Sequence, residues 1–317
     1  MNIGLIQGAH FETPVWVYLL QNIFPELNIP RTEPWKYKQT SDKSIIVSAN
    51  LDCGKIKGHR NGGMYYELTS DNKTPIIFYT GEPYDVHVNS STGKHKYLII
   101  SSLKHQIEDN VFHIPFAFMW YTHFYLNKYL HKFRDTPILG TYFLGYCATR
   151  KTNTRTEFMT KITNNNNNKN IICYGVDNNY TCIKKIINRT PAPNFLLVKE
   201  YSMCNFVLTF ENCEKQGYIT EKIICAFISG AIPIYLGDHN YAKELFNPKA
   251  FICVRDFDSF DCCIEYIVNM NDQDILSMKK EPMFTDNIVP DIFKVDDFSD
   301  NTIYGKLKKH IRAWYDL

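Results

Sequence analysis

The sequence lacks an excess of charge of either sign. Its 317 residues carry 35 Lys and Arg against 33 Asp and Glu, which leaves a formal net charge of +2. Nucleic-acid-binding proteins usually gather a basic surface strong enough to change the overall composition. We therefore expect no nucleic-acid partner. Hydrophobic residues make up 44% of the chain, enough for one large or two ordinary domains with well-formed cores.

Long hydrophobic runs are also missing. No window approaches the roughly 18 consecutive apolar residues that a membrane-spanning helix needs. Near Met1, Glu12 and Pro14 interrupt the apolar residues, and no basic region precedes them as it would in a signal peptide. We expect a soluble protein located in the cytoplasm.

The cysteines lack the spacing of a zinc site. There are ten, none of them in a Cys-x-x-Cys pair, and Cys262 and Cys263 are adjacent. Disulfide frameworks are typical of short secreted chains, and this chain is long. We therefore expect buried, reduced thiols that pack as small hydrophobic residues.

Short apolar runs alternate with polar segments along the first part of the chain. Between them, residues 13–22 have a helical pattern, and residues 59–63 (His-Arg-Asn-Gly-Gly) are interpreted as a loop. Runs of this kind, separated by helical material, are typical of βαβ units with a parallel sheet buried on both faces. The predicted strands are residues 2–7, 44–49, 75–79 and 97–101.

Large aromatic residues recur at helical spacing over residues 116–133, and Asp135-Thr136-Pro137 then ends the pattern. Such a stripe indicates core packing. We place the boundary between two domains here, with residues 1–135 forming the first domain and residues 136–300 the second.

The alternation resumes in the second half of the chain. Residues 164–168, all Asn, are predicted to form a surface loop. We expect strands at 138–148, 171–176, 206–210, 232–236 and 250–254, and helices at 154–162, 220–229 and 259–270.

The last residues, 301–317, are predicted to form a C-terminal helix. Ile303, Leu307, Ile311 and Trp314 follow helical spacing, with Lys and Arg elsewhere. A basic amphipathic helix can bind a membrane. A single short helix more often packs on its own protein, so we expect no membrane contact.

A crowded polar segment follows the predicted strand at 206–210. Glu211 and Asn212 lie at its carboxyl end, where open α/β sheets bind ligands. Thr220 suits the N-cap of the next helix, and Glu221 suits the positive end of the helix dipole. Lys222 opposes that dipole, which is easier to explain if an anion such as a diphosphate binds there. A solvated lysine on the helix surface is the alternative.

These residues resemble the donor-binding signature of the α1,3/4-fucosyltransferases. The resemblance rests on Phe210-Glu211-Asn212, on Gly217-Tyr218-x-Thr220-Glu221-Lys222 and on residues 231–237 (Ala-Ile-Pro-Ile-Tyr-Leu-Gly). It implies an α/β protein of GT-B architecture, with two Rossmann-like domains facing each other across a cleft. The first domain would take a glycan acceptor and the second a GDP-sugar.

The resemblance also implies the reaction. Members of this family transfer L-fucose from GDP-fucose to an acceptor hydroxyl with inversion, here with an α1,3 linkage expected, and need neither a metal nor a cofactor. Carried onto this sequence, Lys222 would neutralise phosphate. Asn212 and Glu221 would contact ribose or fucose hydroxyls, and Tyr218 would lie against the nucleotide-sugar.

Residues 147–155 resemble the strand, loop and arginine-bearing helix of the same family. This places Arg155 as the second diphosphate ligand, a task that suits the planar guanidinium fork. Arg150 and Lys151 are close enough in sequence to take that role instead, and a surface arginine is a further alternative.

Residues 77–82 (Ile-Phe-Tyr-Thr-Gly-Glu) resemble the strand that carries the family's catalytic carboxylate. Glu82 follows an apolar strand and would act as the general base that takes the proton of the acceptor hydroxyl. Asp85 is near enough to replace it, and His87 is a third candidate. Metal ligands are not expected.

Two other functions are compatible with the sequence. The same fold could use another nucleotide-deoxysugar, because the residues specify phosphate binding better than the sugar. The chain could also be a non-catalytic protein that binds sugar nucleotides or glycans. That last hypothesis predicts that Glu82 can be lost without consequence.

Overall fold

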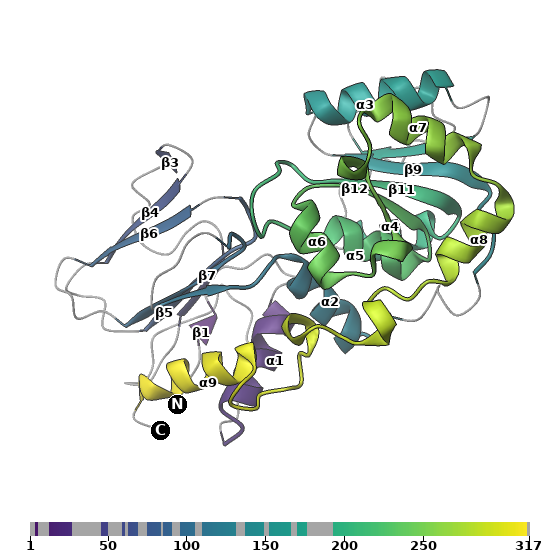
Figure 1. Ribbon diagram of the computed structural model, residues 1–317. Helices are drawn as coiled ribbons and strands as arrows, with labels where there is room; N and C mark the ends of the chain where they lie inside the picture. Colours follow the sequence, from purple (N-terminus) through teal and green to yellow (C-terminus); the bar gives the residue numbers. More distant parts are fainter. Residues whose placement is uncertain are drawn as a thin grey trace. The chain divides into compact units, whose positions relative to one another are not determined.

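In the computed structural model of the protein, the described residues are 4–5, 13–26, 46–49, 59–60, 63–68, 75–83, 85–90, 96–104, 110–130, 137–148, 152–165, 170–175 and 193–315. The chain divides into two compact units, whose elements are labelled in Figure 1. Unit 1 comprises Met1–His123, Lys215–Tyr218 and Pro290–Leu317. Unit 2 comprises Phe124–Glu214 and Ile219–Val289.

Unit 1 contains a five-stranded sheet in the order β1-β2-β5-β7-β8, with every neighbouring pair parallel. Four of these strands confirm the apolar runs predicted from the sequence. Helices α1 (Thr13–Ile23), α2 (Ala117–Leu126) and α9 (Ile303–Ala313) belong to the same unit, apart from the end of α2. The strands are β1 (Gly4–Leu5), β2 (Ile46–Ala49), β5 (Ile76–Thr80), β7 (Tyr97–Ser101) and β8 (Val111–His113).

A second, three-stranded sheet in unit 1 was not predicted. Strand β3 (His59–Arg60) pairs antiparallel with β4 (Gly63–Leu68), which pairs parallel with β6 (Asp85–Ser90). The interpretation of residues 59–63 as a loop is therefore wrong. The intervening sequence, Asn61-Gly62, is the dipeptide that most favours a two-residue hairpin, and a search for apolar runs overlooks it.

Unit 2 contains a five-stranded, fully parallel sheet in the order β10-β9-β11-β12-β13. The five strands confirm the predicted ones, with β9 and β13 shorter than expected. They are β9 (Tyr142–Ala148), β10 (Ile171–Gly175), β11 (Cys204–Phe210), β12 (Ile232–Leu236) and β13 (Ile252–Cys253).

Helices lie on both faces of this sheet, α3 and α7 on one and α4 and α5 on the other (Figure 1). Three helices of unit 2 were not predicted: α4, α6 and α8. Helix α3 also extends into the Asn-rich segment that we expected to be a loop. The helices are α3 (Asn153–Asn165), α4 (Pro193–Tyr201), α5 (Glu221–Ser229), α6 (His239–Leu245), α7 (Phe260–Asn269) and α8 (Asp272–Lys280). Short 3-10 helices lie at Pro248–Ala250 and Val254–Asp256, at Thr285–Asn287 and, in unit 1, at Asp291–Phe293.

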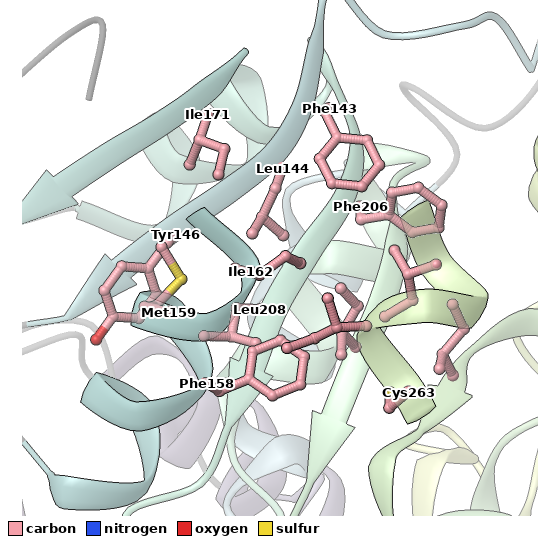
Figure 2. Packing of buried hydrophobic residues seen from close by; sticks show 14 of the residues in the cluster. Phe143, Leu144, Tyr146, Phe158, Met159, Ile162, Ile171, Phe206, Leu208 and Cys263 are labelled. Carbon is pink, nitrogen blue, oxygen red and sulfur yellow. The ribbon is translucent and has the colours of Figure 1, made fainter. Parts of the chain in front are cut away.

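The core of unit 2 lies between the sheet and helices α3 and α7, as Figure 2 shows. Phe158 of α3 packs edge to face on Phe210 of β11, with ring centroids 4.9 Å apart. Both side chains are buried. Truncating a buried phenylalanine costs about 3–5 kcal/mol, so this core holds α3 firmly against the end of β11.

Helix α2 confirms the predicted aromatic core packing but contributes to both units. Tyr121 packs on Phe293 of unit 1 at 4.9 Å, whereas Phe124 packs on Phe195 of unit 2 at 4.9 Å. The division therefore falls within α2, at His123, and not at residue 135. Residues 290–300, predicted to belong to the second domain, group with unit 1.

The C-terminal helix α9 packs on unit 1, as predicted. Leu307 and Ile311 are buried, and the Arg312 guanidinium donates hydrogen bonds to Ile23 O at 3.0 Å and to Glu26 Oε1 at 2.9 Å. The apolar stripe of this helix is thus covered by its own protein. No helix in the described ranges combines the length and the hydrophobicity that a membrane span requires.

Seven described cysteines are free, as expected, but only four of them are buried: Cys147 and Cys213 are partly exposed and Cys262 is exposed. Cys173, a buried residue of β10, is disulfide-bonded, so the expectation is wrong there. Pairing depends on a close approach of two Cα atoms in the fold, which sequence spacing does not reveal. Disulfides persist mainly in oxidising compartments, so this bond does not favour the expected cytoplasmic location.

Candidate functional site

Four of the predicted donor-binding residues lie at one edge of the unit 2 sheet. Strands β9 and β11 are parallel neighbours, so the segments that follow them begin at the same edge. Helix α3 follows β9 and carries Arg155 in its first turn. Asn212 is the second residue after β11, and Glu221 and Lys222 open helix α5.

Arg155 is a buried residue, with 4% of its surface exposed. Its Nε–H donates to Phe210 O at 3.2 Å, and Nη2 donates to the same carbonyl and to Asn212 Oδ1 at 2.9 Å. The alternative of a surface arginine is therefore wrong. Arg150 and Lys151 fall outside the described residues.

Glu211 organises the site, a role that the sequence prediction missed. Its unexposed carboxylate accepts from Thr220 N–H at 2.7 Å, from Thr220 Oγ1 at 2.8 Å and from Lys222 Nζ at 3.0 Å. Burial raises the pKa of Glu211, and the Lys222 ammonium and the two Thr220 donors oppose that rise. The signal available in the sequence was an acidic residue directly after a buried strand.

Lys222 has carboxylate partners within the chain. Besides Glu211, its ammonium contacts Thr220 Oγ1 at 2.8 Å and lies 3.6 Å from Glu221 Oε1. Burial lowers the pKa of Lys222, but the two carboxylates outweigh it and the pKa is raised, so the lysine stays charged. Its side chain is 23% exposed, which excludes a freely solvated lysine. We expected a bound anion to supply the negative charge beside Lys222. Glu211 and Glu221 supply part of that negative charge.

Thr220 occupies the predicted N-cap position of α5 without capping it. Its hydroxyl donates to Glu211 and accepts from the Lys222 ammonium, but it caps no backbone N–H of the first turn. Asp238 and Ser259, by contrast, do cap α6 and α7 with their side chains. The first N–H groups of an α-helix have no partner within the helix. The start of α5 therefore keeps hydrogen-bond donors that its N-cap side chain does not use.

Cys147 lies near the end of β9. Burial raises the pKa of its thiol to about 11, and the charges of Glu221, Arg155 and Lys222 also act on it. Arg155 bonds to Phe210 O, and the next residue, Glu211, bonds to Lys222, so the two groups adjoin at the end of β11. Arg155 with Asn212, and Lys222 with Glu211 and Glu221, belong to a single polar site.

Glu82 and Tyr218 belong to unit 1, whereas the other predicted site residues belong to unit 2. Glu82 follows β5 and is half-buried, as is Asp85 at the start of β6, while His87 is exposed. Tyr218 is buried, with 2% of its surface exposed. Its N–H donates to Lys215 O at 3.1 Å. The roles assigned to Glu82 and Tyr218 stay predictions.

Acidic runs with Asp-x-Asp spacing occur at Asp256–Asp258 and Asp272–Asp274. Asp256 pairs with Lys243, and Asp272 and Asp274 lie in the first turn of α8. The described part of the chain holds no group of three or more His, Cys, Asp and Glu side chains arranged to hold a metal ion. The absence of a metal requirement stays a prediction.

Comparison with known sequences identifies the segment that carries this site. Residues 140–279 match the sequence profile described as Glycosyltransferase family 10 (fucosyltransferase) C-term. This match covers less than half of the chain, and the matched residues are called the family 10 segment. Arg155, Asn212, Tyr218, Glu221 and Lys222 all lie within the family 10 segment, and the resemblance to fucosyltransferases predicted from the sequence is confirmed.

Curated relatives match the chain over short stretches. An alpha-(1,3)-fucosyltransferase of Helicobacter pylori is 53% identical over 66 residues, which cover 21% of this chain and 14% of the relative. A 4-galactosyl-N-acetylglucosaminide 3-alpha-L-fucosyltransferase of Mus musculus is 42% identical over 64 residues, 20% of this chain and 18% of the relative. The chain thus matches less than a fifth of the length of these relatives.

Solved structures resemble the chain over nearly its whole length. A crystal structure of an alpha1,3-fucosyltransferase with GDP has a TM-score of 0.63 at 18% identity and covers 99% of this chain and 89% of its own. One with GDP-fucose has a TM-score of 0.62 at 19% identity and covers 100% and 90%. The fold is therefore GT-B, and the predicted α/β class with parallel sheets is confirmed.

Proposed function

We propose that the protein is a fucosyltransferase that transfers L-fucose from GDP-fucose to a hydroxyl of a glycan acceptor, with inversion and an α1,3 linkage. The observation that carries this proposal is the polar site within the family 10 segment, where Arg155, Asn212, Glu221 and Lys222 meet at one sheet edge. Relatives that match part of the chain are named fucosyltransferases.

The proposed donor site binds the diphosphate through cations and helix N–H groups. Lys222 and Arg155 offset its negative charge, and the first N–H groups of α5 donate hydrogen bonds. Glu211 fixes the Lys222 ammonium and Thr220 through hydrogen bonds. Because Arg155 and Lys222 keep their positions through bonds within the protein, the donor meets a site that is already arranged.

The sugar end of the donor is assigned to three further residues. Asn212 and Glu221 form hydrogen bonds with ribose or fucose hydroxyls. The side chain of Asn212 is exposed and is held by Arg155. Tyr218 contributes packing against the nucleotide-sugar. These assignments rest on the match of each residue to the fucosyltransferase signature.

Glu82 is the proposed general base. Its carboxylate takes the proton of the acceptor hydroxyl while that oxygen attacks the anomeric carbon of fucose from the face opposite the nucleotide. The bond between fucose and the diphosphate breaks, and GDP leaves with the bonding electrons. The configuration at the anomeric carbon inverts, and the proton remains on Glu82 until solvent removes it.

Donor binding is the first test. Isothermal titration calorimetry and thermal shift should detect GDP and GDP-fucose, because a ligand that binds only the native state raises the melting temperature. Lys222→Ala should weaken the shift that GDP causes, whereas Lys306→Ala, at an exposed position of α9, should not. Comparing ligand-induced shifts corrects for any stability that a variant loses by itself.

Transfer is the second test. Mass spectrometry of glycan acceptors incubated with GDP-fucose should detect a product heavier by one fucose. Stabilisation by UDP or dTDP without stabilisation by GDP would contradict the choice of donor. Donor binding without transfer to any acceptor in a broad glycan panel would support the non-catalytic alternative.

A further inference from the structure

The loop between β11 and α5 belongs partly to unit 1. The chain leaves unit 2 after Glu214 and returns at Ile219, and Lys215–Tyr218 lie in unit 1. Within that unit, the Lys215 ammonium donates to Pro83 O at 2.8 Å. Pro83 directly follows Glu82, so a cationic side chain from this loop holds the peptide next to the proposed base.

The backbone of the same loop is also fixed to unit 1. Lys104 N–H donates to Gln216 O at 3.0 Å, and His113 Nε2 lies 3.4 Å from Gly217 O. Gly217 has a φ of 83°, and a Cβ there would lie 2.5 Å from His113 Nε2. Only glycine fits this close approach without strain. Lys215 is therefore carried by a loop whose path is set by its own backbone contacts.

The backbone groups of Glu82 also bond to two residues at the ends of sheet strands. Glu82 N–H donates to Thr80 Oγ1 at 3.2 Å, and Ser102 Oγ donates to Glu82 O at 3.0 Å. Thr80 and Ser102 are fully buried. These contacts fix the backbone of Glu82. The bond from Lys215 fixes the carbonyl of the next residue, Pro83.

We propose that Lys215 is a positioning residue for Glu82. It does not touch the reacting atoms; it holds the Glu82-Pro83 turn so that the carboxylate meets the acceptor hydroxyl. The inference rests on the proposed function, with Glu82 as base. A hydrogen bond from a charged donor is stronger than a neutral one, and a displacement of about 1 Å can cost a catalytic group up to roughly 10²-fold in rate.

The loop that carries Lys215 also leads into the proposed donor site. It continues directly into Thr220 and Lys222, which bond to Glu211 in the donor site. The residue that holds the base and the residues that hold the phosphate groups are thus on one short piece of chain.

A double-mutant cycle tests the proposal with Glu82→Gln, Lys215→Met and the two together. Lys215→Met should lower kcat by roughly 10- to 100-fold with little change in the dissociation constant of GDP-fucose. In the Glu82→Gln background the same change should cost almost nothing, since no base remains to be positioned. Lys215→Arg, which keeps a charged donor, should recover most of the rate. Lys294→Met removes an exposed lysine paired with Asp291 in unit 1 and should leave the rate unchanged.

Each outcome separates the inference from the function on which it rests. An active wild type whose rate survives Lys215→Met overturns the inference alone. So does an equal loss from Lys215→Met in both backgrounds, which would assign Lys215 a general structural role. Urea unfolding of each variant identifies any loss of fold. A wild type that transfers no fucose to any acceptor, or an unaffected Glu82→Gln variant, refutes the proposed function or base and with it the positioning role.

Discussion

At the scale of single residues, Glu211 explains the geometry of the candidate donor site. A buried carboxylate is costly unless it is paired and hydrogen-bonded, and Glu211 meets that requirement through Thr220 and Lys222. The same three bonds place a lysine at the first turn of α5, against the preference of the helix dipole. The Glu211 carboxylate therefore offsets the unfavourable interaction of Lys222 with the helix dipole, and the proposed function needs this lysine to bind the diphosphate.

Replacing Glu211 by Gln should destabilise unit 2 and weaken GDP binding. The amide keeps the shape but loses the charge that faces the Lys222 ammonium, and a lost charged hydrogen bond costs about 1–3 kcal/mol. Urea unfolding measures the stability, and calorimetry measures the affinity for GDP. Glu214→Gln is the matched control, because its pair with Arg255 is largely exposed and such pairs contribute about 0–1 kcal/mol. Equal effects of the two substitutions would contradict the organising role of Glu211.

At the scale of elements, Lys279 shows how helix α8 is held in unit 2. Its side chain is 5% exposed, and its ammonium donates to Ile138 O at 2.9 Å and to Cys204 O at 3.0 Å. Burial lowers the pKa of Lys279 from 10.5 to about 8. The neighbouring Cys204 thiol has its pKa raised to about 12, also by burial, and stays neutral over that interval. A charged lysine thus anchors α8 at neutral pH at some cost of desolvation.

This arrangement predicts how the stability conferred by Lys279 depends on pH. Between about 8 and 10.5 the unfolded chain binds the proton of Lys279 more tightly than the native protein does, so this residue favours the native state more as pH rises. Urea unfolding at about pH 7 and pH 9.5 should show the stability of wild type rising relative to Lys279→Met, by about 1–2 kcal/mol. Groups common to both proteins cancel in this difference. A difference that stays constant or falls with pH would contradict the lowered pKa of Lys279.

The elements that the sequence predicted, and those that it did not, differ in a physical way. Parallel strands such as β5 and β11 are buried on both faces and read as continuous apolar runs. The hairpin β3–β4 and the short helices α6 and α8 lack such runs, and the apolar run of α4 covers only residues 195–198. Helix α6 has only seven residues and depends on a cap by Asp238, so its hydrophobic pattern is too short to detect.

The residues of the candidate site also divide into those that the sequence could predict and those that it could not. Lys222, Glu221 and Asn212 could be placed because each lies next to a predictable strand end or helix start. The role of Glu211 could not, since it depends on a contact with Thr220, nine residues later, across a loop. The contact between Lys215 and Pro83 joins residues 132 positions apart, and no local pattern encodes it.

At the scale of the whole molecule, the chain passes between the two units four times, at His123–Phe124, Glu214–Lys215, Tyr218–Ile219 and Val289–Pro290. A linear division at residue 135 cannot represent this path, because two segments return to unit 1 after the chain has formed most of unit 2. Helix α9 and the residues from Pro290 onward complete the core of unit 1, as the packing of Phe118 on Tyr304 illustrates. The GT-B fold here is therefore built from units that are not continuous in sequence.

Transfer by the whole protein should not require a divalent metal ion. A metal would serve to offset the charge of the leaving diphosphate, and in the proposed site Arg155, Lys222 and the first N–H groups of α5 do so instead. The lysine is kept charged by Glu211 and Glu221, which raise its pKa despite burial. The rate of fucose transfer should therefore persist after dialysis against EDTA, with EDTA already saturated with Ca²⁺ as the control for the chelator itself. A moderate gain on adding Mg²⁺ would agree with screening of the free nucleotide, whereas complete loss in EDTA that Mn²⁺ restores would show that these side chains do not replace a metal.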